Sequence, residues 1–557
     1  MSEMDSGIDT PDSSLPATTA DGAARARALA QARNATVAPT GLVSYASSGR
    51  LALIGPAAES SPVAERVGDA LESMIIAPPG DESGDGGGAR VIHAAIVEVE
   101  GHLGAFTLRG EGAGAPIVVA PSPLTGGKPF DIVIDLRPEP ALAHEILPPG
   151  YFAPRGDQAA LQAAIDEAMD LVGEFEKPRY FGYDPDICAH GASGIGGCTR
   201  CLDACPTGAI RSLGERVEVD PYLCQGAGVC ASACPTGAMT YAYPPPDGQL
   251  AALRAALTAY LEAGGRSPAL LFHDSERGAQ AWAHVANEAP ESVLPWEVEE
   301  IGSVGMDAWV ACIAWGARVV LLVPEQVPES VRRELDAQIG VTRAILESMG
   351  YAPALLTLLT DDQALGAALA SEPAPAAAPP ATFATSGEKR TDIRLALDHL
   401  HDHARLRPDV ANLPATAPFG NVEADRDACT LCMACVSVCP ASALQAGGDE
   451  PRLSFIEMNC VQCGLCERAC PESCITRSQR YLFDREARRR PRTLNEDQPF
   501  RCVSCGKVFG TASVVMRMQQ RLAGHSMFQA PGALARLQMC EDCRVKDMFR
   551  SEANSPR

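Results

Sequence analysis

Two short cysteine motifs in the second half of the chain constrain its fold more than any other feature. One reads CTLCMACVSVCP from Cys429, and the other reads CVQCGLCERACP from Cys460. In each motif three cysteines stand three residues apart, and a fourth follows after three intervening residues and precedes a proline. Soft thiolates spaced this closely suit iron–sulfur clusters or zinc, but zinc sites usually join two separated cysteine pairs. A disulfide scaffold is disfavoured because the sequence shows no secretory signal. We therefore expect iron–sulfur clusters here.

The spacing also predicts which cysteines share a cluster. In the bacterial two-cluster ferredoxin run, the first three thiolates surround one [4Fe-4S] cluster and the fourth ligates the other. One predicted ligand set is therefore Cys429, Cys432, Cys435 and Cys470. The other is Cys460, Cys463, Cys466 and Cys439. Cys474 is surplus to this pattern, and we expect it to pack without a metal.

A less regular copy of the same motif lies upstream. Its first half lacks a cysteine three residues before Cys198, so Cys188 is the only candidate for that position, and its second half has Ala227 in place of the second cysteine. The crossover rule predicts one complete set, Cys188, Cys198, Cys201 and Cys234, and one incomplete set, Cys224, Cys230 and Cys205. Three thiolates can hold a [3Fe-4S] cluster, or a cubane with a ligand other than cysteine, for which His190 is a weak candidate. The alternative is a vestigial half without metal.

Two CxxC pairs stand near the end of the sequence, Cys502 with Cys505 and Cys540 with Cys543. Four thiolates in two separated pairs are typical of a closed tetrahedral zinc site in a zinc ribbon or a treble-clef-like knuckle. Gly506 follows the second cysteine, which leaves backbone amides free to point at sulfur. We predict structural zinc; iron, a redox dithiol and an empty site are the alternatives.

The whole sequence predicts a multidomain α+β chain. Its 557 residues suggest roughly four domains. The expected divisions are a disordered tail (1–40), an N-terminal mixed α/β domain (41–180), an irregular ferredoxin-like domain (181–245), an α/β layer domain (246–370), a Pro/Ala linker (371–391), a regular 2[4Fe-4S] ferredoxin domain (392–480) and a zinc-ribbon-like four-cysteine tail (481–557). In the α/β domain, buried strands over 269–272, 319–323 and 354–359 alternate with helices, which favours a parallel sheet. In the N-terminal domain, Ser61 and Pro62 predict a helix start.

Composition limits the partners. The net charge of −24 argues against a nucleic-acid partner and suits a soluble protein that meets other redox proteins through complementary charge. The most apolar stretch, 308–323, contains Arg318, so we expect no membrane span. The basic run over 477–492 is interpreted as a solvated face or, alternatively, a docking patch for an acidic partner. Cysteine-rich sites without an export signal indicate the cytoplasm.

The tail segments PFRCVSCGKVFGT, LAGHSMF and LQMCEDCRVKDMF, with LPPGY at 147–151 and the ferredoxin units, carry a resemblance. With these features the chain resembles a family of bacterial 4Fe-4S dicluster ferredoxin-type proteins encoded beside molybdenum- or tungsten-dependent formate dehydrogenases and their maturation chaperones. The resemblance covers most of the chain after residue 40 and implies electron transfer or assembly support for a formate dehydrogenase in the cytoplasm. Ala227 departs from the usual motif. Residues 266–360 also look faintly like the small α/β subunit that relays electrons in some hydrogenase complexes, although its cysteines are absent here.

The strong chemical signals in the sequence are cluster ligands, and no nucleophile, acid–base pair or cofactor loop stands out. We therefore expect an electron carrier without a substrate site of its own. It would pass single electrons through three or four clusters between a redox partner and a formate dehydrogenase or related oxidoreductase. The alternatives are a non-enzymatic maturation factor for such a dehydrogenase and a catalytic subunit with a substrate site in the α/β domain.

Overall fold

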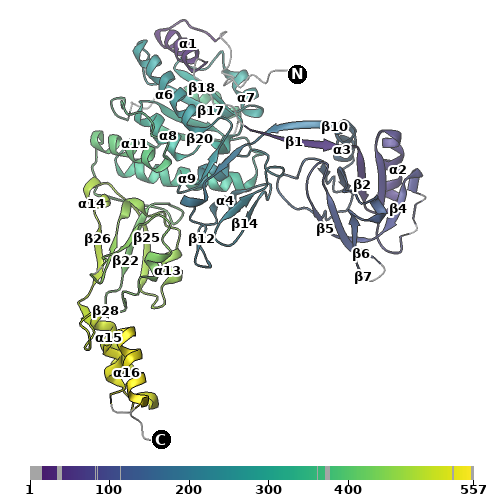
Figure 1. The fold of residues 1–557 in the computed structure, drawn as a ribbon. Helices are drawn as coiled ribbons and strands as arrows, with labels where there is room; N and C mark the ends of the chain where they lie inside the picture. Colours follow the sequence, from purple (N-terminus) through teal and green to yellow (C-terminus); the bar gives the residue numbers. More distant parts are fainter. Residues whose placement is uncertain are drawn as a thin grey trace.

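The computed structural model describes residues 15–33, 41–81, 83–84, 86–112, 115–360, 362–370, 377–448, 450–529 and 532–553. These residues form an elongated molecule with an N-terminal domain on one side of a central body and the C-terminal tail at one end (Figure 1). Within these ranges, every helix is too short or too polar to cross a membrane.

A five-stranded parallel sheet forms the centre of the N-terminal domain. Its strand order is β4 (Arg90–His93), β3 (Glu72–Ala77), β2 (Arg50–Ile54), β8 (Ile132–Asp135) and β9 (Tyr151–Phe152). Helices α2 (Ala57–Val67) and α3 (Gln158–Asp170) pack on one face, and an antiparallel sheet of β5 (Ala95–Glu100), β6 (Thr107–Gly112) and β7 (Ala115–Ala120) packs on the other. Strand side chains alternate between faces, so Leu51 and Leu53 join the helix-side core while Ala52 and Ile54 join the core between the sheets.

Helix α2 begins earlier than the sequence predicts. Its first residue is Ala57, whose amide donates to the carboxylate of Asp81 at 2.7 Å. Pro62 therefore lies inside the helix, not in its first turn. The cap comes from a loop that follows β3, which local sequence patterns do not reveal.

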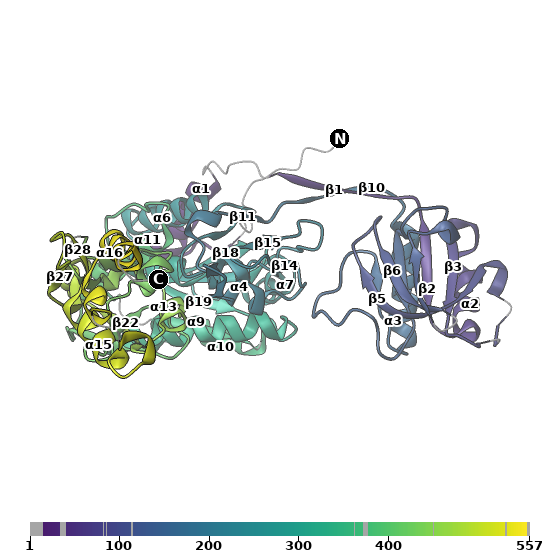
Figure 2. The same ribbon diagram turned by 60° about the horizontal axis from the view of Figure 1, so that its bottom comes forward.

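A two-stranded ribbon joins the N-terminal domain to the rest of the molecule. Strands β1 (Leu42–Ser47) and β10 (Gly173–Pro178) pair antiparallel along their whole length (Figure 2). From this ribbon the Tyr45 hydroxyl donates to the carbonyl of Tyr222 in the irregular ferredoxin unit at 2.7 Å. The Gln225 side chain donates to the carbonyl of Leu147 at 2.6 Å. The LPPGY segment thus lies against the irregular ferredoxin unit.

The α/β domain has a four-stranded parallel sheet in the order β18 (Val293–Val298), β17 (Ala269–Asp274), β19 (Arg318–Leu322) and β20 (Leu356–Leu359). The helices between and around these strands are α6 (Pro246–Glu262), α7 (Arg277–Val285), α8 (Met306–Ala314), α9 (Glu329–Ser348) and α10 (Asp362–Ala370). The parallel sheet agrees with the predicted alternation. Strand β18 is absent from the strands that the sequence predicts. It contains Pro295, which is tolerated there because β18 is an edge strand and an edge residue can lack an amide proton.

Residues 20–33, which the sequence analysis assigned to a disordered tail, form helix α1 (Ala20–Arg33). Ala24 and Ala28 are fully buried against the α/β domain. The hydroxyl of Tyr260 on α6 donates to Asp21 at 2.7 Å. Helix α1 is therefore stabilised by its packing on α6, through small alanines spaced four residues apart. The composition of the segment does not predict this packing. Residues 1–14 and 34–40 of that expected tail lie outside the described residues.

Two ferredoxin units follow the same plan of short antiparallel strand pairs and short helices. Unit 1 (residues 181–241) contains the pairs β11 (Phe181–Tyr183) with β16 (Met239–Tyr241) and β14 (Ile210–Ser212) with β15 (Val217–Val219), and helices α4 (Arg200–Ala204) and α5 (Val229–Ala233). Unit 2 (residues 420–496) contains β22 (Gly420–Ala424) with β25 (Ile475–Leu482), β23 (Leu444–Ala446) with β24 (Arg452–Phe455) and β26 (Arg492–Glu496), and helices α12 (Ala434–Ser437) and α13 (Leu465–Ala469). Strand β21 (Val410–Asn412) extends the first of these sheets.

Helix α11 (Lys389–His403) connects the α/β domain to unit 2. Its buried face packs on the core that includes α8. The residues before it, within the expected Pro/Ala linker, also lie on the α/β domain: the Ala381 amide donates to the carbonyl of Ala314 at 2.8 Å, and the rings of Trp315 and Phe383 are 5.6 Å apart.

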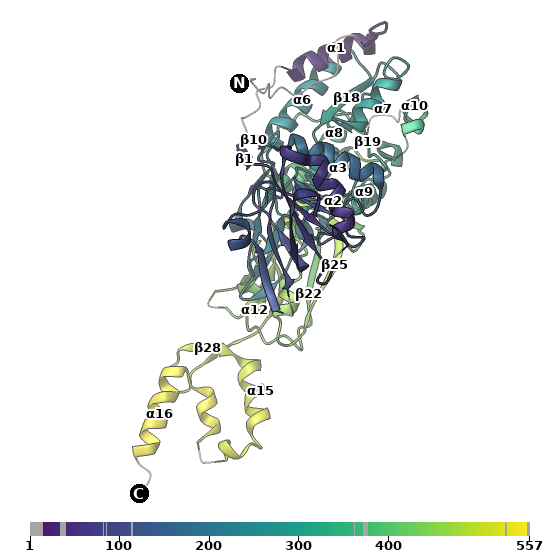
Figure 3. The same cartoon turned by 90° about the vertical axis from the view of Figure 1, so that its right-hand side faces the viewer.

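The C-terminal tail extends beyond unit 2 (Figure 3). It consists of the hairpin β27 (Pro499–Arg501) and β28 (Val508–Thr511), helix α15 (Ala512–Leu522) and helix α16 (Glu541–Ala553). Arg517 on α15 donates to the carbonyl of Asp427 at 2.8 Å, which fixes the tail beside the first cysteine motif of unit 2.

Candidate metal centres

The cysteines of unit 2 gather around two separate cavities, which we number sites 3 and 4. Site 3 is bordered by Cys439, Cys460, Cys463 and Cys466. Site 4 is bordered by Cys429, Cys432, Cys435 and Cys470. In each case the structure brings together the four cysteines that the crossover rule groups. The surroundings are apolar: Leu431, Leu453, Phe455 and Ile475 belong to the same buried cluster as the thiols.

The local backbone explains how these loops surround a centre. Leu431 and Met433 in the first motif, and Gln462 and Gly464 in the second, have positive φ angles between 54° and 84°. Left-handed residues curl the chain around the space between the sulfurs and turn amides inward. The Ala443 amide donates to Cys439 Sγ at 3.3 Å, and the Gln462 side-chain amide donates to Cys460 Sγ at 3.3 Å. Donors aimed at sulfur suit thiolates that carry negative charge.

Cys474 is a fifth thiol at site 4. It is buried, borders the same cavity and lies with its Sγ 3.4 Å from Cys470 Sγ. Cys474 falls outside the motif, so the sequence predicts that it packs without a metal. Its position four residues after Cys470, at the turn that leads into β25, was the available signal.

The cysteines of unit 1 form two further groups, sites 1 and 2. Site 2 contains Cys188, Cys198, Cys201 and Cys234: burial raises the pKa of the Cys201 thiol, and the charges of the other three raise it further. Site 1 contains Cys205, Cys224 and Cys230: burial raises the pKa of the Cys230 thiol, and Cys224 and Cys205 add to the rise. Raised thiol pKa values mean that metal binding must displace protons.

A hairpin resolves the irregular spacing before Cys198. Strands β12 (Gly191–Ala192) and β13 (Ile195–Gly196) fold the insertion back on itself, and the Cys198 amide donates to the carbonyl of Ala189 at 2.9 Å. Cys188 thereby reaches the other thiols of site 2. His190 is buried, with Nδ1 2.8 Å from the carbonyl of Cys198 and Nε2 2.6 Å from Ser212 Oγ. Both ring nitrogens have partners, which argues against a ligand role.

Site 1 keeps the cluster-binding backbone but lacks one thiol. Gly226 and Gly228 have φ angles of 83° and 70°, matching Gln462 and Gly464 in unit 2. Ala227 occupies the position of Cys463 and packs against the α/β core. A Cβ added at Gly302 would lie 2.4 Å from the carbonyl of Ala227, so the loop after β18 closely covers this corner. The missing thiol is thus replaced by an apolar contact between domains.

One lysine lies beside site 1. Lys177 on β10 donates to the carbonyls of Tyr222 at 2.8 Å and Cys224 at 2.6 Å, and its ammonium lies 5.0 Å from the ring centre of Tyr45. Burial lowers the pKa of Lys177 to about 8, although the charges of Cys224 and Asp220 oppose this effect. The N-terminal ribbon therefore places a positive charge beside site 1, and no sequence motif predicts this contact.

The tail cysteines form a more compact group than the other four. Cys502, Cys505, Cys540 and Cys543 have all four sulfurs within 4.8 Å of one another, and Cys505 Sγ is 3.6 Å from Cys540 Sγ. Tetrahedral Zn–S bonds of about 2.3 Å place sulfurs about 3.8 Å apart, so this spacing suits one ion better than a cubane. Burial opposes ionisation of Cys502, but amide hydrogen bonds from Cys540, Cys505 and Ser504 outweigh it and lower its pKa to about 6.

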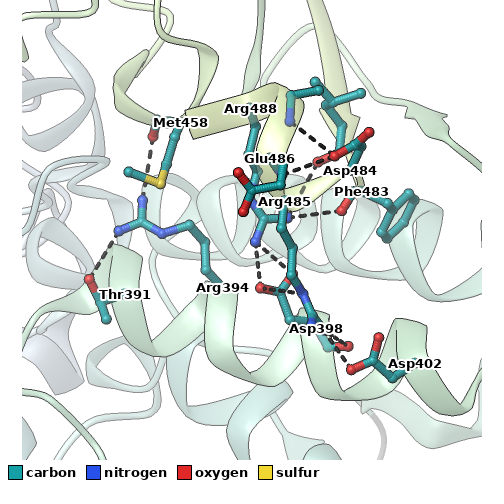
Figure 4. Close-up of polar contacts among 12 residues, drawn as sticks. Thr391, Arg394, Asp398, Asp402, Met458, Phe483, Asp484, Arg485, Glu486 and Arg488 are labelled. Atoms are coloured by element: carbon teal, nitrogen blue, oxygen red, sulfur yellow. Dashed lines mark hydrogen bonds and ion pairs between the residues drawn. The ribbon is translucent and has the colours of Figure 1, made fainter. Parts of the chain in front are cut away.

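The basic run of 477–492 contacts the chain itself. Arg477 pairs with Glu467 and Arg480 with Glu457. Arg485 and Arg488, in helix α14 (Arg485–Arg489), point toward Asp398 and Asp402 of α11 (Figure 4). Arg485 and Arg488 join unit 2 to α11, whereas Arg477 and Arg480 pair within unit 2. The Arg488 side chain is 4% exposed and so does not lie on the expected solvated face, while the docking patch stays a prediction for the rest of the run.

Comparison with known families agrees with this geometry. Residues 167–238 and 428–474 each match the 4Fe-4S dicluster domain family. A search of curated proteins finds no significant match. The two matched segments contain all the thiols of sites 1 to 4, and the donor sets fit iron–sulfur clusters because thiols converge on apolar cavities with amides directed at sulfur. The chain therefore carries two ferredoxin-type iron–sulfur domains.

Proposed function

We propose that this protein relays electrons through several iron–sulfur clusters and has no substrate site of its own. Sites 2, 3 and 4 would each hold a [4Fe-4S] cluster. Site 1 would hold a [3Fe-4S] cluster or a cubane with one ligand other than cysteine, and the tail would hold zinc. When bound, such clusters accept and release single electrons. The observation that carries the proposal is the convergence of fifteen motif cysteines, in the predicted groups, on four centres within two matched domains.

The residues around the centres support electron transfer over bond-making chemistry. Buried apolar side chains pack around the thiols of Cys435, Cys460 and Cys466, and amides directed at sulfur favour a negatively charged centre. Cys432 is exposed, so site 4 has an edge that a redox partner can approach.

The tail supports docking to a protein partner. Large apolar side chains are exposed along it, including Met516, Met527 and Phe549, which are 52%, 76% and 68% exposed. In the proposal these side chains, from α15, the turn after it and α16, contribute to the contact with the partner. Together with the resemblance in the tail motifs, this supports a formate dehydrogenase or a related cytoplasmic oxidoreductase as the partner.

Metal analysis of the full chain prepared without oxygen tests the proposal. Three or four clusters predict about 12 to 16 iron atoms per chain, with matching sulfide and about one zinc. Electron paramagnetic resonance of the oxidised protein should show a [3Fe-4S] signal from site 1. Cys224→Ala should remove that signal and leave the others. Unit 2 thiols found free or bound to zinc would contradict the relay.

A role in maturation of the dehydrogenase is the second candidate. It is favoured by the tail, which extends beyond the ferredoxin units and carries exposed apolar side chains (Figure 3). A deletion strain separates the two roles. Dehydrogenase purified without its metal cofactor would favour maturation, whereas active enzyme uncoupled from its cellular acceptor would favour electron relay.

A further inference from the structure

The two ferredoxin units meet edge to edge near sites 2 and 3. A Cβ added at Gly197 would lie 2.8 Å from Leu465 Cγ, so the hairpin of unit 1 lies directly against α13 of unit 2. Arg468, also on α13, donates to the carbonyl of Gly196. Cys198 of site 2 directly follows Gly197, and Cys463 of site 3 stands two residues before Leu465. The two thiols lie close enough for their charges to interact. Units separated by almost two hundred residues thus present neighbouring centres to each other.

Two basic residues at the start of α11, Lys389 and Arg390, lie at this junction. The Lys389 ammonium donates to three carbonyls at the end of α5, those of Ala231, Ser232 and Cys234, at 2.9, 2.5 and 3.1 Å. Cys234 belongs to site 2. Lys389 therefore binds the backbone segment that carries Cys234, one of the site 2 thiols.

Arg390 contacts both units at once. Its Nη1 donates to the carbonyl of Pro235 in unit 1 at 3.3 Å, and its Nη2 donates to the carbonyl of Cys460 in unit 2 at 2.9 Å. The guanidinium also lies 4.9 Å from the ring centre of Phe419. Pro235 follows a site 2 cysteine and Cys460 is a site 3 cysteine, so one planar cation spans the two ligand loops.

Helix α11 is held in place beyond these two residues. Arg394 donates to the carbonyl of Met458 at 3.4 Å, and Asp398 receives Arg488 from unit 2 (Figure 4). The helix thus binds unit 2 at both ends while its buried face packs on the α/β domain. A bridge mounted on a fixed helix sets the distance between the loops that it joins.

We propose that Lys389 and Arg390 are positioning residues that hold site 2 against site 3, so that the two ferredoxin units work as one relay. This inference rests on the proposed electron-transfer function. In the step it describes, one electron leaves a reduced cluster at site 2, which is oxidised, and enters an oxidised cluster at site 3, which is reduced. No covalent bond changes. The Arg390 charge beside Cys460 also favours the more negative, reduced state at site 3.

The test uses the full chain with its clusters reconstituted without oxygen. In the fully reduced protein, two clusters held close together broaden or split each other's paramagnetic resonance signals. Arg390→Met should weaken this interaction. It should also make reduction of site 3 tenfold less favourable, which lowers the site 3 midpoint potential by about 59 mV for one electron. Arg390→Lys keeps the positive charge but loses the planar guanidinium that donates to both units. It should therefore weaken the spin interaction between the clusters, while the site 3 midpoint potential shifts less than in Arg390→Met. The site 3 signal is assigned from its change in Cys463→Ser.

Arg343→Met is the matched control. Arg343 is also partly buried and donates to a backbone carbonyl, that of Leu356, but it lies on α9 away from the thiol loops. It should leave both the interaction and the potential unchanged. Arginine variants that keep their iron, their spin interaction and the site 3 potential would overturn the inference and leave the relay intact. Wild-type protein that binds no clusters at sites 2 and 3 would instead overturn the proposed function.

Discussion

The ion pair between Arg488 and Asp398 gives the sharpest test of how α11 is attached to unit 2. The Arg488 side chain is 4% exposed and that of Asp398 is 16% exposed, with nitrogen to oxygen distances of 2.5 and 2.6 Å. Removing one partner of a buried pair leaves the other charge uncompensated, which costs about 3 to 5 kcal/mol. Arg488 keeps contacts with the carbonyls of Leu482 and Phe483, so Asp398→Ala should fall at the lower end, about 3 kcal/mol.

Asp402 supplies the matched control on the same helix. It pairs only with Arg485 among the described residues, at 2.6 Å, and the two side chains are 53% and 42% exposed. Solvent-exposed pairs contribute about 0 to 1 kcal/mol. Asp402→Ala should therefore have less than a third of the effect of Asp398→Ala.

Hydrogen exchange of the intact, cluster-loaded chain measures the difference. A local loss of about 3 kcal/mol corresponds to about a hundredfold fall in amide protection, since 1.4 kcal/mol is tenfold. We expect that fall in peptides covering 398–403 and 483–490 of Asp398→Ala, and less than a fivefold fall in Asp402→Ala. Equal, small changes in both variants would show that the buried pair does not fasten α11, and the reasoning from burial would be refuted.

Three further predictions concern the other parts of the molecule. Burial opposes ionisation of Asp135, but hydrogen bonds from Arg137, Ala141 and Tyr151 outweigh it and lower its pKa. The carboxylate therefore contributes its full stabilisation above the ordinary carboxyl pKa, and this stabilisation is lost as pH falls through the lowered pKa. Asp135→Asn should destabilise the N-terminal domain by about 3 kcal/mol at pH 7 and flatten its acid unfolding curve, as followed by circular dichroism. Cys474→Ala should lower the site 4 midpoint potential, by less than about 59 mV, while iron content stays constant, because a nearby thiol proton stabilises the reduced state; loss of iron would mark Cys474 as a ligand. Cys502→Ala should remove the tail zinc and expose α16 to protease while the iron content stays unchanged, whereas loss of iron would contradict a zinc site.

The cysteine groups followed from the sequence because their geometry is local. Three thiols within seven residues, with a fourth before proline, leave few ways to arrange a loop, and the crossover rule then pairs the halves. Even the irregular unit obeys it, since a hairpin absorbs the insertion before Cys198. The parallel sheet of the α/β domain followed from an equally local alternation of apolar strands and amphipathic helices.

What the sequence did not reveal depends on partners far away in the chain. The start of α2 is set by Asp81, and the order in α1 by packing on α6. Strand β18 contains a proline, Pro295, which a strand tolerates at the edge of a sheet, and whether a strand lies at an edge depends on the whole sheet. Lys389 and Arg390 end a Pro/Ala-rich stretch and bind backbone carbonyls, which any residue can offer. Because the acceptors are backbone carbonyls, no pattern of side chains in the sequence identifies the partners of Lys389 and Arg390.

Different domains outside the ferredoxin units contact site 1 and site 4. Site 1 is covered by the α/β loop at Ala227 and by Lys177 from the N-terminal ribbon. Site 4 lies beside the tail, through Arg517 and through Asn495, which donates to the carbonyl of Cys429 at 3.3 Å. If sites 2 and 3 form the internal junction of the proposed relay, electrons would enter and leave at sites 1 and 4. Among the motif thiols of the four sites, Cys432 of site 4 is the exposed one, so the proposed relay would be open to the direct approach of a redox partner at the tail end. The tail that carries the formate dehydrogenase resemblance thus lies beside the site whose motif thiol is exposed.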